Sequence, residues 1–137
     1  ATPGEARMLA EAGAPDVLLA YPVVGPNRQR LHRLRAEFPQ TRFAALVDHP
    51  DAARALSGAF ADAPLDVFLD LNVGMNRTGL AATDAAAVFQ VCEKLPGLRV
   101  VGLHGYDGHI RDTDLTDRTR SADAWFALAL TVQRDLE

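Results

Sequence analysis

The apolar residues of this chain gather in four short runs in which polar and apolar positions do not alternate. Strands of a parallel sheet that is covered on both faces have this character, because neither face of the strand meets water. The pattern therefore predicts four buried, parallel strands. They lie at residues 17–21, 43–47, 67–71 and 100–103.

The segments between these runs carry helical spacing and helix end signals. Thr2, Pro3 and Glu5 have the pattern of a capping box, and Gly13 followed by Pro15 marks the end of that first helix. Further helices are expected from about 26 to 38, 50 to 63, 83 to 95 and 114 to the end of the chain.

Two of these helices carry more detailed expectations. Thr83 and Asp84 are expected to cap the fourth helix, and Trp125, Leu128 and Val132 to form the apolar side of the fifth. Strict alternation of helix and strand predicts an α/β fold with right-handed crossovers. This fits half of a (β/α)8 TIM barrel or a small doubly wound sheet.

A dinucleotide fold loses support because no Gly-x-Gly-x-x-Gly fingerprint follows the first strand. Both ends of the chain lie in mid-pattern, which favours the barrel. We therefore expect residues 1–137 to be one partial barrel domain and an internal piece of a longer protein.

Composition narrows the classes of function. The chain has 137 residues, 48% of them apolar, and a formal charge of −4, which argues against nucleic acid as the partner. The basic run Arg28, Arg30, Arg33 and Arg35 fits the wet side of a helix. The single cysteine, Cys92, is expected to be a buried apolar residue. No run is long enough to span a membrane, so a cytoplasmic protein is the default expectation.

Candidate chemistry lies where the strands end, because parallel α/β folds place their sites at the carboxyl ends of the strands. Polar residues and glycines concentrate after the third strand, in 70–79, and after the fourth, in 104–109. Arg77 lies between two glycines and offers a permanently charged, forked donor to an anion. Asp70 interrupts an apolar strand, where a carboxylate needs a partner such as Arg77 or a backbone amide. Alternatively, Asp70 caps the following turn.

The fourth strand end holds His104, Tyr106, Asp107 and His109 within six residues. If the strand stays extended, His104 and Tyr106 point the same way. Imidazole and carboxylate groups suit zinc or manganese, but no second cluster supplies further ligands. We therefore expect no metal ligands within this chain, and an organic cofactor or substrate is the favoured partner of this segment.

Two segments resemble a known family, that of D-threonine aldolase and D-serine dehydratase. The stretch Asp70-Leu-Asn-Val-Gly-Met-Asn-Arg-Thr-Gly79 resembles its acidic-x-acidic-x-Gly-Met-x-Arg-x-Gly motif, with Asn72 in place of the second acid. The stretch Leu103-His-Gly-Tyr-Asp-Gly-His109 resembles its Leu-x-x-Tyr-x-Gly-His motif. Segments 2–6 and 16–22 resemble the ends of earlier barrel strands, so the resemblance spans nearly the whole chain.

The resemblance implies an alanine-racemase-like barrel that binds pyridoxal phosphate and acts on D-amino acids with a β-hydroxyl. We also expect the full-length protein to be a homodimer and, from the lack of a long apolar run, to have no membrane partner. The Schiff-base lysine of the family would lie upstream of Ala1, because the one lysine here, Lys94, falls late in a helix. The phosphate site, and a divalent metal held by a further domain, would lie downstream of Glu137.

Roles follow for the residues that match the motifs. Arg77 would lie near the phenolic oxygen of the cofactor, Tyr106 would face the pyridine nitrogen and His104 would pack beside the ring. His109 would face the substrate and relay a proton. The expected activity is retro-aldol cleavage of a D-3-hydroxy amino acid to glycine and an aldehyde. Dehydration of D-serine, racemisation and cofactor binding without turnover remain alternatives, as does a fragment that is inactive alone.

Overall fold

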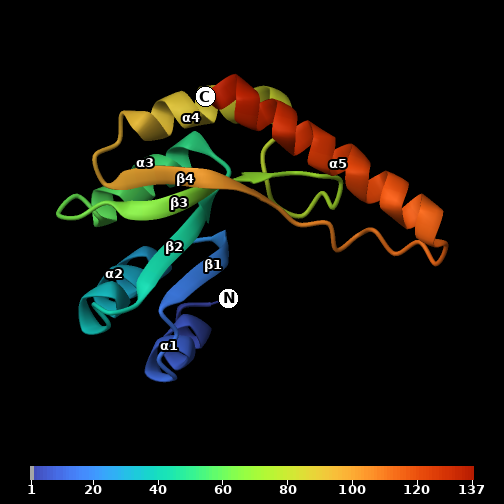
Figure 1. Ribbon diagram of the computed structural model, residues 1–137. Coiled ribbons are helices and arrows are strands. Elements are labelled where there is room, and N and C mark those ends of the chain that lie inside the picture. Colours follow the sequence, from blue (N-terminus) through green and yellow to red (C-terminus); the bar gives the residue numbers. More distant parts are fainter. Residues whose placement is uncertain (1) are drawn as a thin grey trace.

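The computed structural model describes residues 2–137, in which helices and strands alternate from one end to the other (Figure 1). The strands are β1 (Asp16–Pro22), β2 (Arg42–Val47), β3 (Leu65–Leu71) and β4 (Leu98–Gly105). The helices are α1 (Pro3–Glu11), α2 (Asn27–Glu37), α3 (Pro50–Ala59), the 3-10 turn η1 (Ala82–Asp84), α4 (Ala85–Glu93) and α5 (Leu115–Leu136). The four predicted strands are confirmed, each with boundaries within three residues of those expected.

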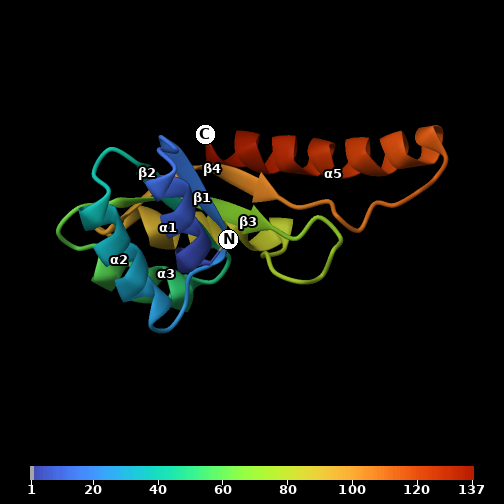
Figure 2. The same ribbon diagram turned by 90° about the horizontal axis from the view of Figure 1, so that it is seen from below.

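The strands form one parallel sheet in the order β1-β2-β3-β4. Each crossover therefore steps in the same direction, and right-handed crossovers that all step one way place their helices on one face. A doubly wound sheet reverses direction and covers both faces. The strand order thus distinguishes half of a (β/α)8 barrel from a doubly wound sheet, and it fits the barrel. Figure 2 shows α1, α2 and α3 gathered on one side of the curving strands.

The core lies between the sheet and these helices. One set of alternate strand residues is buried against the helices, including Val17, Leu19, Ala45, Val67 and Leu69. The opposite, inner face of the sheet carries the other alternate residues of each strand, among them the charged residues described below. The helices contribute Ala6, Leu31, Leu34, Ala53, Leu56, Val88 and Cys92 to this core, together with Phe60 directly after α3.

Most helix ends follow the sequence signals. The capping box is present, since Thr2 N donates to Glu5 Oε2 and Glu5 N donates to Thr2 Oγ1.

The prediction that Thr83 and Asp84 cap the fourth helix is wrong. Asp84 has helical backbone angles and makes no capping hydrogen bond, because it is the last residue of the 3-10 turn η1, which directly precedes α4. A capping side chain needs an extended backbone to reach the free amides.

Helix α5 begins as expected, with Asp114 accepting hydrogen bonds from Thr116 N and Asp117 N. Its apolar side is only partly as expected, because Val132 is buried and Trp125 half-buried but Leu128 is 40% exposed. Leu128 lies next to the row of α5 residues that contacts the rest of the protein, and not within it.

The carboxyl half of α5 lies near α4, and its other half projects outward (Figure 1). Within residues 2–137, no helix has the length and apolar character needed to cross a membrane.

At the amino ends of the strands, the inner face of the sheet carries a ladder of alternating charges. Asp16 pairs with Arg42, Arg42 with Asp66, and Asp66 with Arg99. The Asp66–Arg99 contact is 2.6 Å long, and Asp66 is 4% exposed. The two arginines flank the buried carboxylate from both neighbouring strands, so its charge is balanced without any group from outside. We call these four residues the arginine ladder.

Candidate functional site

The loop that follows β3, residues 72–80, is shaped by its own hydrogen bonds. The side-chain oxygen of Asn72 accepts hydrogen bonds from the backbone amides of Gly74 and Asn76, each 3.1 Å long, and its Nδ2 donates to Asn76 Oδ1. Asn76 has a φ of 55°, a left-handed conformation that asparagine tolerates better than most residues. Asn72 therefore organises the turn at the position where the motif described above has an acid.

The same loop is fastened to the sheet at its far end. Leu80 N donates to the Asp70 carbonyl, and Gly79 N donates to Asp48 Oδ2 at the end of β2 over 3.1 Å. Gly79 has a φ of 99°, and a Cβ there would lie 2.6 Å from Asn72 N. Only glycine fits this close approach. The loop is thus held at both ends, and Arg77 lies on it.

The guanidinium of Arg77 is held between two aromatic rings. Its Cζ atom lies 5.6 Å from the ring centre of Tyr21, at the end of β1, and 4.8 Å from that of Tyr106, after β4. Among residues 2–137, no carboxylate forms a salt bridge with Arg77. Aromatic faces orient a cation without neutralising its charge. Arg77 is therefore positioned and available to an anionic group.

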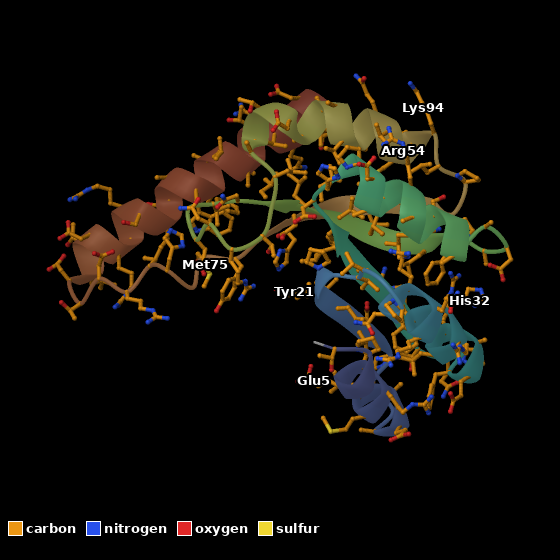
Figure 3. The ribbon with its side chains drawn as sticks, turned by 180° about the vertical axis from the view of Figure 1, so that it is seen from behind. Glu5, Tyr21, His32, Arg54, Met75 and Lys94 are labelled. Atoms are coloured by element: carbon orange, nitrogen blue, oxygen red, sulfur yellow. The ribbon has the colours of Figure 1, made fainter. Side chains whose placement is uncertain are left out.

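Tyr21 was not singled out from the sequence. The signal that could have found it is its place at a strand end, where an aromatic side chain is half exposed instead of packed under a helix. Figure 3 shows Tyr21 and Met75 at the same end of the sheet, with Lys94 at the opposite end. The position of Lys94 agrees with leaving it out of the site.

Asp70 is buried on the inner face of β3, with 2% of its surface exposed. Its Oδ1 lies 2.7 Å from His104 Nδ1, and its Oδ2 accepts a hydrogen bond of 2.9 Å from Thr78 Oγ1. The expectation that Arg77 or a backbone amide would be the partner of the Asp70 carboxylate is wrong. The tyrosines hold Arg77 away from it, and the sheet register places His104 directly beside Asp70.

The other two predicted residues lie on the loop after β4. The strand ends at Gly105, so Tyr106 lies on the loop that directly follows it. The Tyr106 ring lies over Gly108, where an added Cβ would come within 2.4 Å of the phenolic oxygen. The His109 ring lies over Gly74, where an added Cβ would come within 2.6 Å of Nε2. The loops after β3 and β4 therefore touch, with His109 on their shared rim.

These loops line a small pocket at the carboxyl end of the sheet. Its walls come from residues of both loops and from the end of β3: Asp70, Leu71, Asn72, Val73, Met75, Arg77, Thr78 and Tyr106. A wider hollow lies at the amino end, lined by Arg42, Asp66 and Arg99, but the charges there pair with one another. The carboxyl-end pocket is the better candidate site. In the part of the chain that the structure describes, no group of three His, Cys, Asp or Glu side chains could hold a metal ion.

Comparison with known proteins identifies the family. Residues 1–134 match the family described as alanine racemase, N-terminal domain. The chain belongs to this family. An uncharacterized protein of Mycobacterium tuberculosis is 31% identical over 111 residues, which are 80% of this chain and 64% of that protein. An alanine racemase of Nitrosospira multiformis is 35% identical over 85 residues, 62% of this chain and 23% of that protein.

A D-threonine aldolase of an Arthrobacter species is 31% identical over 111 residues, 78% of this chain and 28% of that enzyme. The crystal structure of D-threonine aldolase from Filomicrobium marinum matches with a TM-score of 0.83 and 29% identity, over 98% of this chain and 38% of that one. Alanine racemase from Bacillus anthracis shares the fold, with a TM-score of 0.70 and 18% identity over 96% of this chain and 33% of that one. The chain is thus part of an alanine-racemase-like barrel, and it spans less than two thirds of the relatives it matches.

Proposed function

We propose that the protein containing this chain binds pyridoxal phosphate at the carboxyl end of its barrel and cleaves D-3-hydroxy amino acids. The reaction is that of a D-threonine aldolase: the Cα–Cβ bond breaks, the β-hydroxyl loses its proton to form an aldehyde, and Cα gains a proton to give glycine. The proposal is supported by the family membership of the chain and by the similarity to D-threonine aldolases.

The observation that carries the proposal is the placement of Arg77 between Tyr21 and Tyr106. A permanent cation without a carboxylate partner in residues 2–137 suits the negatively charged phenolic oxygen of pyridoxal phosphate. The exposed Tyr106 hydroxyl can donate a hydrogen bond to the pyridine nitrogen. The residues present therefore fit the cofactor, whose lysine and phosphate attachments would come from other parts of the protein.

Pyridoxal phosphate, when bound, supplies the electron sink that takes up the electron pair of the breaking bond. The residues of this chain orient the ligand and move protons. Arg77 would hold the anionic oxygen, and the Tyr106 hydroxyl would donate a hydrogen bond to the ring nitrogen. His109, on the rim where the two loops touch, accepts the proton of the substrate β-hydroxyl at a ring nitrogen.

The test uses the full-length protein and D-threonine. We expect acetaldehyde and glycine in equal amounts, together with a visible absorbance band from the bound cofactor. Replacement of Arg77 by Ala is expected to shift that band and to lower turnover about 100-fold, since one positioned charge contributes about 3 kcal/mol to a transition state. Tyr106→Phe should retain the cofactor and lower turnover about 10- to 1000-fold.

Arg33→Ala serves as the matched control, because Arg33 is an exposed arginine of α2 outside the pocket. This variant should behave as the unmodified protein. Unchanged absorbance and turnover in both Arg77→Ala and Tyr106→Phe would contradict the proposal, because neither residue would then lie at the cofactor.

A second candidate function is amino-acid racemisation, favoured by the 35% identity to an alanine racemase. The same preparation distinguishes the two. Loss of optical rotation from L-alanine without release of an aldehyde from D-threonine would indicate a racemase. Ammonia release from D-serine would indicate a dehydratase.

A further inference from the structure

The Asp70–His104 pair has a feature that the family motifs do not describe. Asp70 is buried, and both of its oxygens are occupied, one by His104 Nδ1 and one by the Thr78 hydroxyl. A carboxylate can only accept hydrogen bonds. An imidazole is also a stronger base than a carboxylate in water. The hydrogen between Asp70 Oδ1 and His104 therefore belongs on Nδ1.

The consequence concerns the other ring nitrogen. With its hydrogen on Nδ1, the neutral ring of His104 carries a lone pair on Nε2. No residue among 2–137 forms a hydrogen bond with Nε2, and the side chain is 19% exposed. Asp70 and Thr78 both line the carboxyl-end pocket, and Tyr106 follows two residues after His104. His104 is not itself one of the lining residues, but its ring contacts Asp70 in the pocket wall and carries an unused acceptor there.

A bulge in the sheet produces this pairing. In the register between β3 and β4, Asp66 lies beside Arg99, but a bulge between Val67 and Phe68 shifts the partners by one residue. Asp70 consequently faces His104 instead of Leu103. A bulge that re-aims a side chain is a frequent feature beside active sites.

Stability alone gives no reason for such a pair. Apolar residues of similar size commonly replace a buried polar pair without loss of stability, and the neighbouring inner position, Phe68, is apolar. The buried carboxylate of Asp66 is balanced by permanent cations. The only basic side chain that contacts Asp70 among residues 2–137 is the imidazole of His104, which can release its proton.

We propose that Asp70 is a positioning residue that holds His104 in the Nδ1–H form, so that Nε2 accepts a hydrogen bond from the ligand in the carboxyl-end pocket. The donor is an O–H or N–H group of the amino-acid substrate, because the cofactor proposed above presents an anionic oxygen to Arg77 and a ring nitrogen that accepts from Tyr106. The inference rests on the proposed function for the identity of these ligands. The hydrogen position itself does not depend on them.

The first test is nuclear magnetic resonance of the full-length protein labelled with 15N-histidine. In the ligand-free protein, the His104 ring should show a protonated Nδ1 and an unprotonated Nε2 at a pH where it is neutral. Asp70→Asn should reverse this, because the amide NH2 donates to Nδ1 and leaves the hydrogen on Nε2. An Nε2–H form in the unmodified protein overturns the proposal, and this measurement needs no variant to fold.

The second test adds ligands in turn. A hydrogen-bond shift of the Nε2 signal that appears only after D-threonine is added to the protein with bound pyridoxal phosphate supports the substrate as the donor, and the same shift with pyridoxal phosphate alone contradicts it. No change with either ligand overturns the proposal. In Asp70→Asn, kcat for D-threonine should fall about 100-fold or more, as when a similar carboxylate-to-amide change fixes the wrong imidazole form. The Kd of pyridoxal phosphate should stay within about threefold.

Asp66→Asn is the matched control, since Asp66 is the other buried aspartate of β3 and lies at the opposite end. It should change neither the His104 signals nor kcat. An equal fall of kcat in both variants would show a general loss of structure and overturn the proposal. If the unmodified protein does not cleave D-threonine, the proposed function fails, and the 15N signals still decide the role of Asp70. If it does cleave D-threonine and Asp70→Asn is unaffected, the positioning role alone fails.

Discussion

Two aspartates of β3, four residues apart on the same inner face, are both buried but have opposite surroundings. Asp66 lies at the amino end between Arg42 and Arg99, which carry permanent charges. Asp70 lies at the carboxyl end between a histidine and a threonine, beside a pocket. One site is complete within the chain. The other leaves a ring nitrogen of His104 without a hydrogen-bond partner, and Arg77 nearby without a carboxylate partner, in residues 2–137.

The two surroundings indicate different roles for the two ends of one strand, stability at the amino end and chemistry at the carboxyl end. Barrel enzymes place their catalytic groups at the carboxyl ends of the strands, while the amino ends serve stability. Here the same residue type follows that division. The arginines beside Asp66 carry a permanent charge, whereas the imidazole beside Asp70 is a group that can take up or release a proton.

The largest effect on stability is expected from a substitution at the amino end of β4. A Cβ at Gly97, just before β4, would lie 2.2 Å from the Ser57 carbonyl oxygen, and neither backbone can move away easily. We expect Gly97→Ala to lower the free energy of unfolding by about 3 kcal/mol, measured by urea denaturation of the full-length protein. Turnover per folded molecule should be unchanged. Gly58→Ala is the control, because a Cβ at that position meets nothing within 4 Å.

A smaller loss of stability is expected when the arginine ladder is interrupted. Asp66→Asn removes the charge between Arg42 and Arg99 and should cost about 2 kcal/mol, the usual contribution of a hydrogen bond to a charged group. Asp16→Asn, at the exposed end of the ladder, should cost less than about 1 kcal/mol. Urea denaturation at low and high salt measures both. Equal costs for the two variants would mean that burial does not distinguish Asp66.

Thr78→Val tests the carboxyl end with a nearly isosteric change. It removes the hydroxyl that donates to Asp70 Oδ2 and keeps the contact with His104. The expected cost in unfolding free energy is about 1 kcal/mol, and turnover should fall by less than in Asp70→Asn. Thr83→Val, an exposed threonine outside the pocket, provides the comparison. A cost larger than that of Asp66→Asn would reverse the proposed division between the two ends.

The last effect is absent at neutral pH and belongs to neither end of the sheet. Burial under the sheet raises the pKa of the Cys92 thiol to about 11 from the usual 9.0. The folded state therefore favours the neutral thiol, and its contribution to stability is complete below pH 9 and is lost as pH rises through about 11. Urea denaturation from pH 8 to 11, compared with Cys92→Ala, measures this loss. Equal slopes in the two proteins would contradict it.

Much of the fold follows from local sequence. Continuous apolar runs predicted the strands, and the capping box and prolines predicted most helix ends. The cap of α4 was not predicted, because a 3-10 turn can absorb the residues that would otherwise cap the helix. The exposed side of α5 was mispredicted, because apolar spacing does not show which of two adjacent helix sides meets the sheet.

The candidate site was predicted in part. The structure brings Arg77 and Tyr106 together, and their roles toward the cofactor stay predictions. The partner of Asp70 could not be found, because it depends on a bulge that shifts the β3–β4 register by one residue. Such a shift leaves no mark in the spacing of apolar residues. Tyr21 contacts Arg77 across the sheet, so its role required the curvature of the strands as well as their order.

The sequential strand order also determines when the site can form during synthesis. Asp70 and His104 are 34 residues apart in the chain, and Asp48 and the Gly79 amide are 31 apart. Each strand therefore meets its partner as soon as the next helix and strand have left the ribosome, and the entropy lost in closing such a loop rises only slowly with its length. The residues of the arginine ladder leave the ribosome in the order Asp16, Arg42, Asp66 and Arg99, and His104 follows on the same strand as Arg99. The loop after β4, with Tyr106 and His109, is therefore the last part of the candidate site to leave the ribosome.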